Sequence, residues 1–229
     1  MIKAEHGPVV MREAMPPLTQ LLMDAAALTL RFARVPRATR HEDGLRAETD
    51  SDHTVMLTVL ACAYAAQHAP HLDLGKIAQY AAVHDLVEAY AGDVLSLGMS
   101  ADTRHLKEIR EHEALKRIAS EFAHLPWIAA TIFEYEQLAS EEARYVKIFD
   151  KVLPKLTHLL NGGAALREHG FSYEKAHADH LRQRAQMARE YPQADALAVF
   201  DAIVTTCAQQ WGIDEGVIFG GAALETTPR

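Results

Sequence analysis

The residues best suited to do chemistry lie in a short apolar segment at positions 80–93. His84, Asp85 and Glu88 interrupt a run of alanine, valine, leucine and tyrosine that is typical of a buried helix. At about 100° per residue, these three side chains fall within roughly one 100° sector of a helix. An unpaired buried carboxylate costs several kcal/mol, which a bound divalent metal ion would offset. Imidazole and carboxylate are common ligands of transition metals, so the segment predicts part of a metal site.

Two residues elsewhere in the chain are candidates for the missing ligands. His53 lies in the first turn of an expected helix, where a histidine can project into a neighbouring cleft. Asp150 lies on a helix face that is otherwise apolar. Taken alone, His53 is equally consistent with a solvated histidine, and Asp150 with an ion pair to Lys147 or Lys151. The predicted metal ligands are His53, His84, Asp85 and Asp150. Two imidazoles and two carboxylates leave positions open for water and substrate, as in a catalytic site.

Helices must position these side chains, because helical periodicity dominates the chain and alternating strand patterns are absent. The expected helices span residues 17–33, 51–68, 74–91, 103–123, 126–138, 140–160, 172–190 and 193–210. Residues 34–48 form an arginine-rich polar segment that we expect to be a loop. Gly92 is expected to end the helix at 74–91, with Asp93 just past its end. Pro154 is expected to kink its helix.

The predicted fold class is therefore all-α, with one domain over residues 1–229. Its metal-site core covers about 30–160, a helical extension covers about 165–210, and a loosely held tail covers about 212–229. No internal repeat, linker or low-complexity block divides the chain.

Composition limits the possible functions. The chain has 229 residues, a net charge of −8 and a pI near 5.9, which argues against a general nucleic-acid binder. A small phosphorylated substrate needs only a local basic cluster. No apolar run is long enough to span a bilayer and no secretory signal is visible, so we expect a cytoplasmic protein, with Cys62 and Cys207 as reduced core thiols. Eight of the thirteen histidines lie among charged or turn residues and are assigned no role: His6, His41, His68, His71, His124, His169, His177 and His180.

The order of the candidate ligands resembles that of the HD-domain metal-dependent phosphohydrolases, which are named after an H…HD…D pattern. His53 precedes His84 by 31 residues, and Asp85 precedes Asp150 by 65 residues, spacings that fit this family. The resemblance implies an HD-type helical bundle that holds one divalent transition metal ion. Mixed nitrogen and oxygen ligands suit Mn, Co, Fe, Ni or Zn.

A closer resemblance, over about residues 30–160, is to the 5′-deoxynucleotidase branch of this family. That branch has an arginine-containing loop and then a segment like Glu-Ser-Val-Ser-Asp-His, and residues 48–53 here are Glu-Thr-Asp-Ser-Asp-His. Its His-Asp-x-x-Glu and Gly-Asp segments match residues 84–88 and 92–93. Its Glu-Tyr-Glu, Glu-Ala-Lys/Arg, Val-Lys and Asp segments match residues 134–136, 142–144, 146–147 and 150.

The resemblance and the residue chemistry together assign roles around the metal. Arg37 and Arg46 precede the first ligand and are candidates to bind the phosphate, because guanidinium groups pair bidentately with phosphate. Lys147, one helical turn before Asp150, is a third candidate. Glu88 is one helical turn from a ligand and is expected to accept a proton from the attacking water. Asp93 is expected to assist catalysis or, as the resemblance implies, to bind a sugar hydroxyl.

The expected function is hydrolysis of nucleoside 5′-monophosphates by a homodimer. The loop at residues 35–40 lacks the tryptophan that the branch usually carries, so the substrate could instead be a cyclic or polyphosphorylated nucleotide. A non-catalytic helical module with a structural or sensing metal is a third interpretation. Glu88 could orient the attacking water instead of accepting its proton. The presence of Glu88 and Asp93, which a purely structural site would not need, favours an enzyme.

Overall fold

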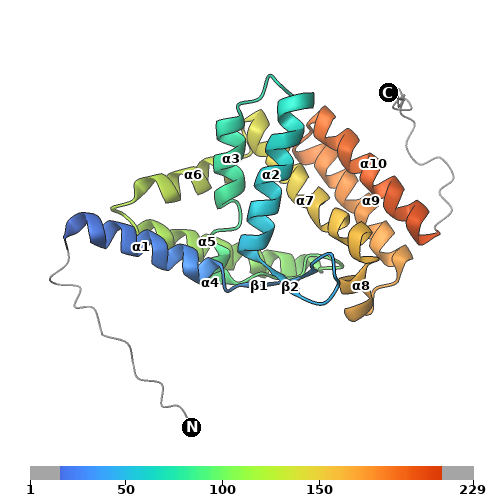
Figure 1. Ribbon diagram of the computed structural model, residues 1–229, viewed down its shortest axis with the longest axis horizontal. Coiled ribbons are helices and arrows are strands. Elements are labelled where there is room, and N and C mark those ends of the chain that lie inside the picture. The colour runs from blue at the N-terminus through green and yellow to red at the C-terminus, as the bar shows by residue number, and fades with distance from the viewer. Residues whose placement is uncertain (1–15, 213–229) are drawn as a thin grey trace, which may run out of the picture.

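The computed structural model describes residues 16–212, which form a helical bundle with one small sheet (Figure 1). Its elements are α1 (Pro17–Phe32), β1 (Pro36–Arg40), β2 (Ala47–Thr49), α2 (Asp50–His68), α3 (Leu74–Val83), α4 (Glu88–Ala91), α5 (Ala101–Glu121), α6 (Pro126–Glu136), α7 (Glu141–Asn161), α8 (Ala164–Glu168), α9 (Tyr173–Glu190) and α10 (Ala194–Trp211). The all-α prediction is confirmed. No described helix is both long and apolar enough to cross a membrane, and both cysteines are free.

The helices begin and end where the sequence provides capping groups. Thr49 caps α2 through a reciprocal capping box, in which its hydroxyl accepts from the Asp52 amide and Asp52 accepts from the Thr49 amide. Ser140 caps α7 by accepting a hydrogen bond from the Ala143 amide. Gly92 ends α4 with a φ of 73°, a value that favours glycine. These caps fix the ends of the segments that carry the candidate ligands.

Helix α7 lies at the centre of the larger hydrophobic core. One side of it packs on α2 and α3, and another side packs on α10, which in turn packs on α9 (Figure 1). Tyr145, Ile148 and Phe149 of α7 are fully buried in this core. Helix α7 continues through Pro154. Because buried side chains surround Asp150 on this helix, Asp150 is held in place by packing.

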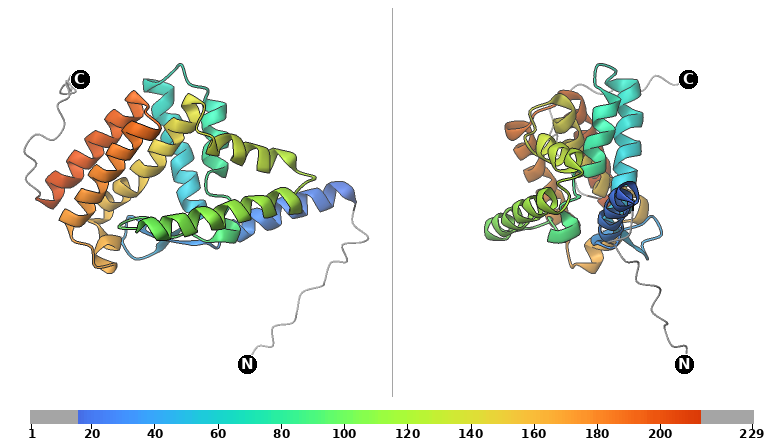
Figure 2. Two further views of the ribbon diagram at one scale, coloured as in Figure 1. Left: turned by 180° about the vertical axis from the view of Figure 1, so that it is seen from behind. Right: turned by 90° about the vertical axis from the view of Figure 1, so that its left-hand side faces the viewer.

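A second hydrophobic core is separate from the first. It contains Leu28 and Phe32 of α1, Ile118 of α5 and Ile132 of α6. Helix α4 contacts both α1 and α5 and lies between them (Figure 2). The segment from α3 to α4 contributes side chains to both cores. His84 and Asp85, which lie in this segment, are therefore located where the two cores meet.

The structure corrects two predictions. Residues 34–48 are not merely a loop, because β1 and β2 pair antiparallel, with Pro36 opposite Thr49 and Arg40 opposite Ala47. Asn161 of α7 anchors this hairpin by donating hydrogen bonds to the carbonyls of Arg40 and His41. The strands are short and polar, and tertiary contacts rather than an apolar alternation hold them, which is why the sequence pattern did not reveal them.

The helix expected at 74–91 is also interrupted. Residues 84–87 form a turn between α3 and α4, in which the Glu88 amide donates to the carbonyl of Asp85, three residues back, at 2.8 Å. His84 keeps right-handed helical angles, with φ −53° and ψ −39°. The side-chain pattern therefore remains that of a helix while the hydrogen bonds tighten, and sequence periodicity cannot distinguish the two. The N-terminal segment and nearly all of the predicted C-terminal tail lie outside the described residues.

Candidate metal centre

The four predicted ligands come together from three separate parts of the chain. His53 lies in the first turn of α2, His84 and Asp85 lie in the turn between α3 and α4, and Asp150 lies in α7. One ligand atom from each residue lies within 4.8 Å of the other three. His53 Nε2 is 3.1 Å from Asp150 Oδ1, and His84 Nε2 is 3.0 Å from Asp85 Oδ2. Such spacing between donor atoms suits one metal ion.

The surroundings of the histidines fit metal ligation. His84 Nδ1 donates to the carbonyl of Ala81 at 2.8 Å, which leaves Nε2 free to coordinate. That Nε2 atom is buried and forms no hydrogen bond among the described residues, and the oxygen 3.0 Å from it, Asp85 Oδ2, belongs to another candidate ligand. On the other histidine, His53 Nδ1 lies 3.8 Å from Glu48 Oε2, and Glu48 accepts a hydrogen bond from Thr39. A buried imidazole nitrogen without a partner is costly, and a metal ion would satisfy it.

Both carboxylate ligands are held ionised, as metal binding requires. Burial alone would raise the pKa of Asp150, but Lys151 and the two histidines outweigh it and hold that pKa well below its usual value. Lys151 Nζ lies 2.7 Å from Asp150 Oδ2, so the ion pair weighed from the sequence is present and involves the other oxygen. For Asp85, His84 and Arg37 likewise outweigh burial and lower the pKa well below its usual value.

Arg37 of β1 contacts three carboxylates at the metal centre. Its Nη1 atom is 2.8 Å from Asp85 Oδ2, 3.0 Å from Asp50 Oδ1 and 3.7 Å from Glu88 Oε2. Asp50 had no predicted role, although it is fully buried and lies directly after the capping Thr49. Nothing in the sequence distinguishes Asp50 from Asp52, the other aspartate of the first turn. Arg37 thus ties a metal ligand to two further carboxylates.

Glu88 is buried beside the centre and paired with a lysine from α5. Lys107 Nζ lies 2.9 Å from Glu88 Oε1 and 3.2 Å from Glu111 Oε1. Glu88 Oε2 is buried without a hydrogen-bond partner among the described residues. Burial, with Asp85 adding to it, raises the pKa of Glu88 to about 10 while Lys107 opposes the change. Lys107 was missed because nothing in the charged sequence of α5 distinguishes it from its neighbours.

The other predicted site residues divide into two groups. Asp93 and Lys147 line a cleft of about 760 Å³ that also contains Asp85 and Glu88. Arg46 does not line this cleft; its side chain is 61% exposed and pairs with Asp52 at 3.4 Å. The structure therefore brings Arg37, Asp93 and Lys147 to the centre and leaves Arg46 outside it.

Comparisons with known proteins identify the family and a similar fold. A family model described as "HD domain" matches residues 30–192. No curated protein matches the chain. Among solved structures, the fold is similar to that of a "Predicted metal-dependent phosphohydrolase" from Magnetospirillum magnetotacticum MS-1, with a TM-score of 0.64. The two sequences are 21% identical, and the alignment covers 82% of this chain and 96% of that chain. At this identity the likeness concerns the fold. The chain belongs to the HD domain family, the superfamily of metal-dependent phosphohydrolases whose ligand order it carries.

Proposed function

We propose that this protein hydrolyses the phosphate ester of nucleoside 5′-monophosphates. The observation that carries the proposal is the four-residue ligand cluster, with Arg37 in contact with it, at the wall of a cleft of about 760 Å³. A cleft of this size can hold a small-molecule substrate. The sequence resemblance to 5′-deoxynucleotidases supports the choice of a nucleoside monophosphate.

The ligands would hold one divalent transition metal ion, with Mn, Co, Fe, Ni and Zn all compatible with the donor set. When bound, the ion lowers the pKa of a coordinated water and polarises a phosphoryl oxygen. Arg37 lies 2.8 Å from the cluster carboxylate of Asp85, and its guanidinium can stabilise charge that develops on the phosphoryl oxygens. Lys147 lines the same cleft and adds a second positive charge.

Glu88 has the position expected of a proton acceptor. Lys107 fixes its Oε1 atom, and its Oε2 atom remains without a hydrogen-bond partner in the described chain. Without a cation beside it, this carboxyl stays protonated at neutral pH, because its pKa is raised to about 10. A metal ion held by the neighbouring ligands would favour the ionised form, which could then take a proton from the attacking water. Asp93 follows the glycine turn at the end of α4 and lines the cleft, where it can accept a hydrogen bond from a sugar hydroxyl.

The test is a substrate screen combined with two substitutions. Nucleoside mono-, cyclic and polyphosphates are assayed with several divalent ions, and metal content is measured for each variant. Glu88→Gln should lower kcat by roughly 10²–10⁴-fold and keep the metal. Asp85→Ala should lose metal and activity together. Glu113→Gln, on the exposed face of α5, is the matched control.

Near-normal kcat in Glu88→Gln on the best substrate would remove Glu88 from the chemistry. Stoichiometric metal without turnover of any phosphate ester would support a structural or sensing module instead. A clear preference for cyclic or polyphosphorylated nucleotides would keep the phosphohydrolase and replace the proposed substrate.

A further inference from the structure

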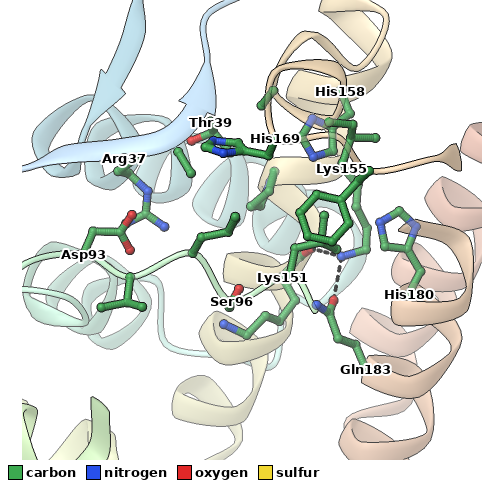
Figure 3. A pocket seen from close by; sticks show the side chains of 18 of the residues that line it. Arg37, Thr39, Asp93, Ser96, Lys151, Lys155, His158, His169, His180 and Gln183 are labelled. Atoms are coloured by element: carbon green, nitrogen blue, oxygen red, sulfur yellow. Dashed lines mark hydrogen bonds between the residues drawn. The ribbon is translucent and has the colours of Figure 1, made fainter. Parts of the chain in front are cut away.

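A smaller pocket of about 90 Å³ opens beside the metal centre, between α7, α8, α9 and the segment after α4. It shares Arg37, Asp93 and Asp150 with the large cleft. Figure 3 shows Arg37 and Asp93 on one side of the pocket and Lys155, His158 and His180 on the other. The proposed mechanism gives no role to this far side.

Lys155 is the most unusual residue there, because its side chain is buried and its charge has no direct counter-ion. The residue is 3% exposed. Its ammonium donates to the carbonyl of Lys151 and to Gln183 Oε1, both at 2.8 Å (Figure 3), and lies 4.6 Å from the centre of the Phe200 ring. No carboxylate of the described chain forms an ion pair with it. A buried cation of this kind is costly unless it is paired.

The carboxylate that could have neutralised Lys155 is engaged elsewhere. Asp179 of α9 accepts from Arg182 at 2.5 Å and from Gln183 Nε2 at 2.9 Å. Gln183 thereby links Asp179 to Lys155 and holds its own carbonyl oxygen toward the lysine. The remaining pocket carboxylates, Asp93 and Asp150, lie at the metal end.

Two histidines beside Lys155 are also unsatisfied. His158 is 7% exposed and His180 is 2% exposed. Each has a buried Nδ1 atom without a hydrogen-bond partner among the described residues. Burial lowers the pKa of His158 to about 4, and the charge of Lys155 adds to this effect. The pocket thus has carboxylates at one end and cationic or donor-capable groups at the other.

An oxyanion would satisfy this far end. It would pair with the ammonium and accept hydrogen bonds from imidazole N–H groups, and hydrogen bonds between charged groups are the stronger kind. A neutral ligand would leave the buried charge uncompensated. Lys155 follows Asp150 by five residues on α7, which places it roughly 7.5 Å further along the helix axis. A second group on a small phosphorylated substrate can span that separation.

We infer that this pocket is a subsite for a second anionic group of the substrate, a phosphate or carboxylate, bound by Lys155, His158 and His180. The inference rests on the proposed function, because it places the scissile phosphoryl group at the metal centre. It also gives the C-terminal region a role, since α9 contributes His180 and Gln183 to the pocket wall. The preferred substrate would then carry two anionic groups.

Kinetics on a matched pair of substrates test the inference. The metal-loaded protein is assayed with a nucleoside 5′-monophosphate and with the corresponding 3′,5′-bisphosphate. The KM of the wild-type protein should be lower for the bisphosphate by at least about tenfold, the size expected from one charge-assisted hydrogen bond. Lys155→Met, which keeps the apolar stem, should abolish this difference and leave the constants for the monophosphate unchanged. Lys116→Met, at an exposed ion pair on α5, is the control.

Equal KM values for the two substrates in the wild-type protein would overturn the subsite, whether or not the variant folds. Gln183→Leu provides a second variant and should weaken the preference for the bisphosphate. If no phosphate ester is hydrolysed, the proposed function fails, and the subsite is then tested by calorimetric titration of the metal-loaded protein with inorganic phosphate. One more phosphate bound per chain in the wild type than in Lys155→Met would support the subsite, and equal binding would refute it.

Discussion

A single guanidinium holds much of the metal centre together. Arg37 contacts Asp50, Asp85 and Glu88, which belong to α2, to the turn after α3 and to α4. Burial alone would lower its pKa, but the carboxylates around it, with Asp85 first among them, raise the pKa above its usual value. Arg37 therefore neutralises buried carboxylates, and in the proposed function it would also bind the phosphate.

Replacing Arg37 by alanine should damage both stability and catalysis. Asp50 is fully buried and would lose its ion-pair partner, a change that typically costs about 3–5 kcal/mol. The Tm should fall, and kcat/KM should fall through KM, or through kcat if the contact with the phosphoryl group forms only in the transition state. Thermal unfolding and steady-state kinetics on the same preparation measure the two effects.

Arg46→Ala is the matched control, since the Arg46 side chain is 61% exposed and its ion pair within residues 16–212 is with Asp52 at the surface. Its unfolding free energy should change by less than about 1 kcal/mol, and its kinetics should match those of the wild type. Equal effects of the two substitutions would contradict the roles that the structure gives to these arginines.

Among the elements, α7 carries the most varied chemistry, because it bears a metal ligand and the buried lysine of the neighbouring pocket. Burial and, after it, the charge of Lys151 lower the pKa of Lys155 from 10.5 to about 7. Below pH 7 both the folded and the unfolded chain carry this proton, and above pH 10.5 neither does. Between these values the unfolded chain binds more protons, so this residue makes stability rise with pH.

In phosphate-free buffer, the unfolding free energy of the wild type should rise with pH relative to that of Lys155→Met. From pH 7 to pH 10, the unfolding free energy of the wild type should rise relative to that of Lys155→Met by up to about 1.4 kcal/mol per pH unit. Lys116→Met, at a side chain that is 60% exposed, should show no such trend. Denaturant titrations at several pH values measure the difference, and one that does not change with pH would show that Lys155 has an ordinary pKa.

At the scale of elements, the sequence predicted most helices because apolar periodicity, proline and capping residues are local signals. Ser140 and Gly92 mark helix ends that the structure confirms. The hairpin formed by β1 and β2 was missed because contacts with α7 and α8 hold it. The turn at residues 84–87 was missed because its backbone angles stay helical while its hydrogen bonds change.

The same division between local and distant signals applies to the site. The metal ligands were predicted because imidazoles and carboxylates stand out in apolar helices, and the structure brings all four together. Asp50, Lys107 and Lys155 were not predicted, because their importance depends on partners 13 to 28 positions away in the sequence. A charged residue acquires such a partner only in the folded chain, so spacing along the sequence does not reveal it.

In the whole molecule, the metal centre lies where separate parts of the fold meet. Helices α2 and α7 and the turn after α3 each supply ligands, and the cores on both sides include residues of this region. The family match extends to residue 192 and therefore includes α9, which lines the neighbouring pocket. The metal should thus act as a cross-link as well as a catalytic group.

Removing the metal should therefore lower the stability of the whole domain. An ion that binds only the folded chain stabilises it by about 2.7 kcal/mol when its free concentration is 100 times its Kd. The purified protein should contain about one transition metal ion per chain by elemental analysis. Chelation should lower the Tm, and stoichiometric Mn, Co or Zn should restore it. Asp85→Ala, which lacks a charged ligand, should unfold at nearly the same temperature with or without the ion. An equal Tm for metal-loaded and chelated wild-type protein would mean that these four residues are preorganised without the ion, with Arg37 and Lys151 alone balancing their charge.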